Sequence, residues 1–189
     1  MLLLVIGIVL FSLVHLFPAL APGARASIVA RLGLVPYKIG FALATIATIV
    51  VIVRGWKAAL GPVLYAPPAW GYHVTPLFVL AAFVLFANGA GPSNLKRRLR
   101  HPQLAAVKVW AFGHLFANGE WRSVILFGGL IAWAVVEMIL INRREQARVK
   151  PAPVSKLATT MTTLAGVAAY VAVMFAHRWL FGVSPFPPG

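Results

Sequence analysis

The chain has 189 residues, of which 61% are hydrophobic and only 11% are charged, and its mean hydropathy is +0.88. A soluble domain carries roughly 25% charged residues, so this composition excludes an ordinary soluble domain and indicates a protein embedded in lipid. The lack of cysteine excludes disulfides and thiolate metal sites, and the lack of aspartate leaves hydrolytic and phosphoryl-transfer chemistry poorly supported.

Apolar segments recur along the whole chain at lengths that suit a membrane. A helix needs about 20 residues to cross the hydrocarbon, and the apolar segments lie at 2–21, 37–55, 70–88, 102–118, 121–141 and 158–181. The first segment has no basic residues before it and no typical cleavage site after it, so we interpret it as an uncleaved span. The fourth is the weakest because it is short and contains Lys108 and His114. The pattern predicts an all-α, polytopic membrane bundle of about six transmembrane helices.

This reading divides the chain into three parts. Residues 1–142 hold the first five helices, residues 143–157 form a basic cytoplasmic loop, and residues 158–189 hold the sixth helix and a C-terminal tail.

The net charge of +14 is concentrated in alternate loops. Loops one, three and five hold most of the basic residues: Arg25, Arg31, Lys38, Lys96, Arg97, Arg98, Arg100, Arg143, Arg144, Arg148, Lys150 and Lys156. The opposite side holds Arg54, Lys57, Arg122 and Arg178. The positive-inside rule then predicts cytoplasmic odd-numbered loops and two periplasmic termini. We expect the basic loops to contact anionic lipids, and we expect no nucleic-acid partner.

Two histidines inside predicted spans are the main candidates for chemistry, because ionisable groups are costly in the membrane. Both His15 and His114 are predicted near mid-depth from the helical rise of about 1.5 Å per residue. Two imidazoles facing each other in an apolar bundle could be axial ligands of haem iron. Each could instead hydrogen-bond a neighbouring helix or take part in proton or ion transport.

Two further polar residues lie on the fourth segment. Lys108 could pair with a haem propionate or extend its amine to the interface. His101 lies where this segment enters from the cytoplasmic side. We take both as candidate cofactor-binding residues.

Several separated motifs resemble the NnrU family over most of residues 1–142. The motifs are His15, Arg31-Leu32-Gly33, Pro36-Tyr37-Lys38, Pro67-Pro68-Ala69-Trp70, Arg100-His101-Pro102, Lys108-Val109-Trp110-Ala111, His114-Leu115, Asn118-Gly119, Leu126-Phe127-Gly128 and Trp133-Ala134. The resemblance implies a multi-pass protein of the bacterial inner membrane, associated with denitrification and with nitric oxide or nitrite metabolism.

The NnrU family is similar to the plastid 15-cis-zeta-carotene isomerases, which are haem b proteins with two histidine ligands. By motif position, this similarity implies that His114 and His15 are ligands and that His101 matches the His-Pro histidine. The isomerases carry a cysteine three residues before the second histidine, where this chain has Ala111. Thiolate ligation is therefore absent, which weakens the case for the full isomerase mechanism.

Three functional hypotheses follow. The first is a haem-b-binding membrane protein with a role in nitrogen-oxide metabolism. The second is a haem-dependent cis–trans isomerase of a polyene, which would require an apolar small molecule as substrate. The third is a non-haem assembly or transport factor whose histidines only bridge helices. The sequence does not fix the oligomeric state.

Overall fold

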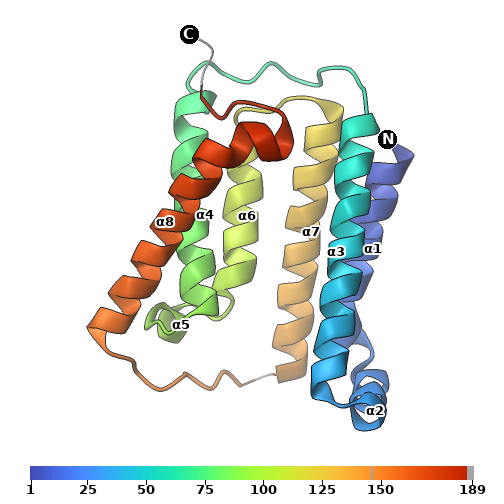
Figure 1. Cartoon of the computed structure of the whole chain (residues 1–189), viewed down its shortest axis with the longest axis vertical. Helices are drawn as coiled ribbons and strands as arrows, with labels where there is room; N and C mark the ends of the chain where they lie inside the picture. The colour runs from blue at the N-terminus through green and yellow to red at the C-terminus, as the bar shows by residue number, and fades with distance from the viewer. Residues whose placement is uncertain (146, 187–189) are drawn as a thin grey trace. The chain divides into compact units, whose positions relative to one another are not determined.

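The computed structural model describes residues 1–145 and 147–186 (Figure 1). Within these residues the chain forms helices and one isolated β-bridge. The helices are α1 (Leu2–Leu20), α2 (Pro22–Leu32), α3 (Leu34–Ala58), α4 (Gly71–Ala90), α5 (Leu95–Arg98), α6 (Pro102–Leu115), α7 (Trp121–Glu145) and α8 (Lys156–Phe181). The all-α prediction is confirmed.

Five of these helices are long and apolar enough to cross a membrane: α1, α3, α4, α7 and α8. In their most apolar windows only 6% to 17% of residues are buried inside the protein. Apolar surface that is not covered by protein must face another apolar medium, which here is lipid. The protein is therefore a multi-pass membrane protein.

The fourth predicted span corresponds to α6, which is shorter than expected. Its 14 residues extend over about 21 Å, whereas the hydrocarbon core is about 30 Å thick. Helix α6 ends at Leu115 rather than near residue 118. Five helices thus meet the length required of a span, against about six predicted.

Two short helices lie where the sequence indicated only basic loops. Helix α2 starts with Pro22 at its first position and stops at Gly33, whose φ of 87° favours glycine. Helix α5 spans a single turn of mostly basic residues. Neither helix contains an apolar run long enough to cross a membrane, so a search for such runs does not detect either of them.

The helices pack into two compact units, each described by itself. Unit 1 contains residues 1–64 and 120–145, with α1, α2, α3 and α7. Unit 2 contains residues 65–119 and 147–186, with α4, α5, α6 and α8. This division follows packing, whereas the division expected from the sequence followed chain order.

In unit 1, α1 packs against both α3 and α7. Leu4 near the start of α1 meets Gly55 near the end of α3, so these helices are antiparallel. Along α7, Gly129 lies beside Ile8 and the ring of Trp133 lies beside His15, so α1 and α7 run in the same direction.

In unit 2, α4 packs against both α6 and α8. A side chain at Gly113 of α6 would collide with Phe78 of α4, which shows how closely these helices approach. Between α4 and α8, the Asn88 amide donates a hydrogen bond of 3.0 Å to Thr163 Oγ1. The Ser93 hydroxyl donates to Asn88 Oδ1. These bonds satisfy polar groups that lipid could not.

The chain leaves unit 1 and returns to it at one place. Val63 forms a β-bridge with Glu120, and the Trp121 amide donates a hydrogen bond of 3.3 Å to the carbonyl of Pro62. Residues 65–119, which contain α4 and α6, therefore begin and end at the same end of unit 1.

Candidate cofactor-binding histidines

His15 lies among aromatic rings from three helices of unit 1. Its ring stacks on Phe11 with centroids 4.1 Å apart, and it meets the edges of Trp133 at 5.1 Å and Phe41 at 5.3 Å. These neighbours come from α1, α7 and α3, and we call the four residues the His15 cluster. The ring is half-buried in an apolar, aromatic setting.

One hydrogen bond fixes the tautomer of His15. Its Nδ1 lies 2.9 Å from the carbonyl oxygen of Phe11, one turn earlier in α1. A carbonyl can only accept, so Nδ1 carries the proton and Nε2 of the neutral ring carries the lone pair. This is the arrangement of a metal-binding histidine, whose second nitrogen typically donates to a carbonyl or carboxylate.

Helix α7 carries two buried polar side-chain atoms, one of which belongs to Trp133 beside His15. Trp133 Nε1 and Glu137 Oε2 are both covered and have no partner at ordinary hydrogen-bond geometry among the described residues, but the two side chains interact with each other. They lie one turn apart on α7. The indole N–H of Trp133 and the carboxyl group of Glu137 lie within reach of each other, so they can satisfy one another and do not by themselves indicate a bound group.

His114 repeats the local geometry of His15 in unit 2. Its Nδ1 lies 2.9 Å from the carbonyl oxygen of Trp110, again one turn earlier on the same helix. The same argument places the proton on Nδ1 and the lone pair on Nε2. The Trp110 ring packs on the imidazole with centroids 4.8 Å apart.

His114 lies in the last turn of α6 rather than in the middle of a span. The preceding carbonyl, that of Gly113, accepts a 2.8 Å hydrogen bond from Thr75 Oγ1, only four residues after α4 begins. At about 1.5 Å per residue, this is roughly 6 Å from the start of α4. His114 therefore lies level with the first turns of α4, while its depth in the membrane stays a prediction.

Helix α6 leaves C-terminal carbonyls that Tyr65 satisfies. The Tyr65 hydroxyl contacts the carbonyl oxygen of Leu115 and lies 3.0 Å from that of Asn118. The Asn118 amide in turn donates a 2.8 Å hydrogen bond to the carbonyl of His114. Partial burial raises the pKa of the Tyr65 hydroxyl above its usual value, so it stays a protonated donor. Tyr65 thus positions the turn that carries His114.

The structure does not bring His101 or Lys108 next to His114. His101 is the N-cap of α6, 13 residues and about 20 Å from His114 along the axis. Lys108 is six residues before His114, which places it about 9 Å away along the axis and roughly 120° around the helix. Their proposed contacts with a cofactor stay predictions.

The described residues contain no group of three or more His, Cys, Asp or Glu side chains able to hold a metal ion. Haem makes a smaller demand, because the porphyrin supplies four nitrogens and the protein adds one or two axial ligands. His15 in unit 1 and His114 in unit 2 each offer one nitrogen of the kind that serves as an axial ligand. The neutral tautomer and aromatic neighbours of each ring fit the demand of haem as well.

Sequence reasoning missed part of the surroundings of His15. Phe11 could have been found, since it lies four residues before His15 and shares its helix face. Phe41 could not, because nothing in a run of apolar residues shows which face of α3 meets α1.

Comparison with known proteins gives one family. The family model described as NnrU protein matches residues 3–185. The match extends beyond the motifs found in residues 1–142 and includes all of α8. No curated protein and no solved structure matches the chain. Since the matched region is nearly the whole sequence, the chain belongs to the NnrU family.

Proposed function

We propose that this protein binds haem b in the bacterial inner membrane and takes part in nitrogen-oxide metabolism. His15 and His114 are the proposed axial ligands. The observation that carries the proposal is the Nδ1 hydrogen bond of each ring to the carbonyl one turn earlier, because it leaves Nε2 with a lone pair for iron. Bound haem would supply one-electron redox chemistry.

The residues around the histidines have separate tasks in this proposal. Phe11, Phe41 and Trp133 provide an apolar wall beside His15 that excludes water from a macrocycle. Family membership supports the link to nitrogen oxides, in line with the resemblance described above.

The reading of His15 as a bridge between helices has less support. Its one side-chain hydrogen bond within the described residues goes to its own helix, at Phe11. A bridging histidine would instead bond a group on another helix. For the isomerase alternative, no observation adds support, since Ala111 is fully buried where the isomerases carry cysteine.

The haem proposal is tested on the full-length protein purified in detergent. We expect a Soret band, together with a pyridine haemochrome spectrum of haem b in stoichiometric amount. Nitric oxide consumption is then compared between membranes with and without the protein. A preparation from haem-supplemented cells that contains no haem would contradict the proposal.

We further propose six membrane passes with both termini in the periplasm. Two observations support this topology: α1 and α7 are parallel in unit 1, and residues 65–119 return to the end where they began. In this proposal α6 and its flanking residues bring the chain back across the membrane. Helix α2, which follows the end of α1, holds Arg25 and Arg31, and the start of α3 holds Lys38, as the positive-inside rule requires of a cytoplasmic end.

Reporter fusions test this topology. Alkaline phosphatase, which is active only in the periplasm, should be active after Gly189 and inactive in the loop at Lys150. A fluorescent protein that folds only in the cytoplasm should give the opposite result at these two sites. Phosphatase activity at Lys150 would mean that α6 does not return the chain.

A further inference from the structure

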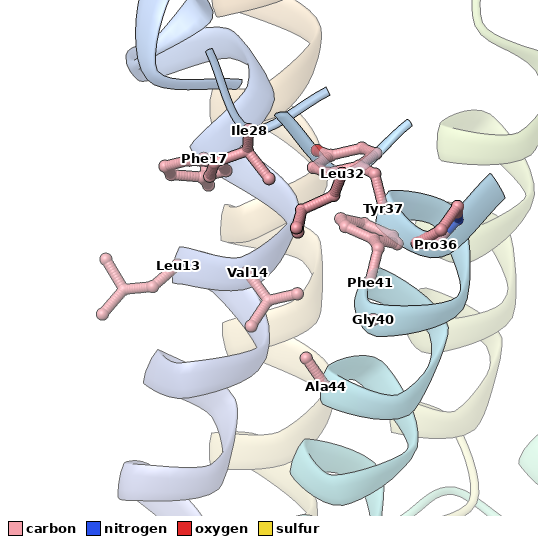
Figure 2. A pocket seen from close by; sticks show the side chains of 10 residues that line it. All are labelled: Leu13, Val14, Phe17, Ile28, Leu32, Pro36, Tyr37, Gly40, Phe41 and Ala44. Carbon is pink, nitrogen blue, oxygen red and sulfur yellow. The ribbon is translucent and has the colours of Figure 1, made fainter. Parts of the chain in front are cut away.

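An apolar groove opens between α1, α2 and α3 of unit 1 (Figure 2). Its volume is about 460 Å³, within the range of about 300–1,000 Å³ that is usual for small-molecule sites. The walls come from the second half of α1, the apolar face of α2 and the first half of α3. No histidine lines it, although Phe41 forms part of its wall and also contacts the ring of His15.

One lining residue brings a polar group into this apolar groove. The hydroxyl of Tyr37 is covered and has no hydrogen-bond partner among the described residues. A buried hydroxyl without a partner is unfavourable, so it indicates a ligand that carries a hydrogen-bond acceptor. The ligand must therefore combine apolar bulk with a polar end.

All charged side chains on α1, α2 and α3, the helices that form the groove, are basic. The guanidinium of Arg25 lies 5.3 Å from the centroid of the Tyr37 ring. Arg25 shares a face of α2 with Ile28 and Leu32, which line the groove, because the three residues have helical spacing. Residues 1–119 contain no acidic side chain that could neutralise it. The polar end of the ligand should therefore be anionic.

The form of α2 places this groove at a membrane surface. Its 11 residues extend over about 16 Å, too little to cross the hydrocarbon, and none of them is buried in the protein. A short helix with apolar residues on one side and arginines beside them is typical of the lipid headgroup region.

We propose that the groove holds one acyl chain of an anionic phospholipid from the adjacent leaflet. The chain lies along the apolar lining from Leu13 to Ala44. The Tyr37 hydroxyl donates a hydrogen bond to an oxygen of the lipid, and Arg25 pairs with the headgroup phosphate. This site is independent of the haem proposal.

The test uses phosphatidylglycerol with a photoreactive diazirine in the middle of one acyl chain. The full-length protein is reconstituted in phosphatidylcholine vesicles that contain this probe or phosphatidylcholine with the same diazirine. We expect labelling by phosphatidylglycerol to dominate at peptides covering 13–17 and 40–44. Arg25→Gln should reduce the preference about fivefold, the effect of one basic residue near an anionic surface.

Two variants separate groove filling from general damage. A Cβ at Gly40 would meet nothing within 4 Å, so Gly40→Leu puts added bulk into the groove wall and should abolish the labelling. Ala42→Leu is the size control, since Ala42 is exposed on the same helix and does not line the groove. Arg54→Gln is the charge control at the other end of α3.

Equal labelling by both lipids, unchanged by Gly40→Leu, would identify ordinary boundary lipid and overturn the proposal. Haem content is measured in every sample. If Gly40→Leu removes haem but leaves lipid labelling intact, the groove houses the cofactor and the lipid assignment is wrong. If no variant contains haem but labelling follows the expected pattern, the haem proposal fails and the lipid site stands.

Discussion

Replacing His15 by glycine is expected to lower the haem-to-protein ratio about tenfold, and His114→Gly should have the same effect. Disturbing the ligands or their supporting bonds at a metal site typically costs 10–100-fold in affinity. In His15→Gly the lost Nε2 lone pair has no replacement, because the neighbours of His15 are aromatic rings without ligating nitrogens. The measurement is the pyridine haemochrome spectrum of protein purified in detergent.

The two substitutions also separate the contribution of each unit. A glycine leaves space for a free imidazole, so adding imidazole should restore the spectrum of a variant whose missing ring was a true ligand. His73→Ala is the matched control, because His73 is exposed near the start of α4 and is not a proposed ligand. Unchanged haem in His15→Gly or His114→Gly would remove that residue from the ligand set.

Gly55→Leu is expected to prevent stable packing of unit 1. A Cβ at position 55 would lie 2.5 Å from the backbone nitrogen of Leu4 and 2.6 Å from its Cα. These are backbone atoms of α1, so a rotamer change cannot relieve the clash and the two helices must separate. Overpacking usually costs about 1–3 kcal/mol, and Gly55→Ala should already destabilise by that amount.

Gly40 provides the matched control on the same helix. A Cβ there meets nothing, so Gly40→Ala should be neutral or stabilise α3 by up to about 1 kcal/mol through helix propensity. The measurement is the fraction of each variant that remains monodisperse in size-exclusion chromatography after heating. Identical heating curves for Gly55→Leu and Gly40→Leu would show that α1 and α3 do not approach as described.

The sequence predicted the long helices well because lipid imposes a simple requirement. Every backbone polar group in hydrocarbon must be satisfied within its own helix, so an apolar run of about 20 residues has few alternatives. The predicted segment 121–141 and α7 (Trp121–Glu145) begin at the same residue. Helix α6 was predicted too long, since residues 116–118 are apolar or neutral but form the turn that Tyr65 satisfies.

The candidate site was predicted less completely. His15 and His114 could be singled out because histidine is rare in lipid, and their hydrogen bonds to the preceding turn follow from helical spacing. The groove with Tyr37 in its wall could not be predicted, because one side of it is α2, a helix that hydropathy does not reveal. Each unit combines two separate stretches of sequence. The local pattern of apolar residues does not show which helices pack together within such a unit.

The return of the chain at Val63 and Glu120 has a consequence for biogenesis. Helices α1 and α3 leave the ribosome first, yet their partner α7 is made only after residues 65–119 have been synthesised. During that interval the face of α1 that later receives Gly129 and Trp133 lacks its partner. The first unit to begin inserting is therefore the one that must wait for its final helix, and nascent α1 and α3 need lipid or an insertase to shield that face meanwhile.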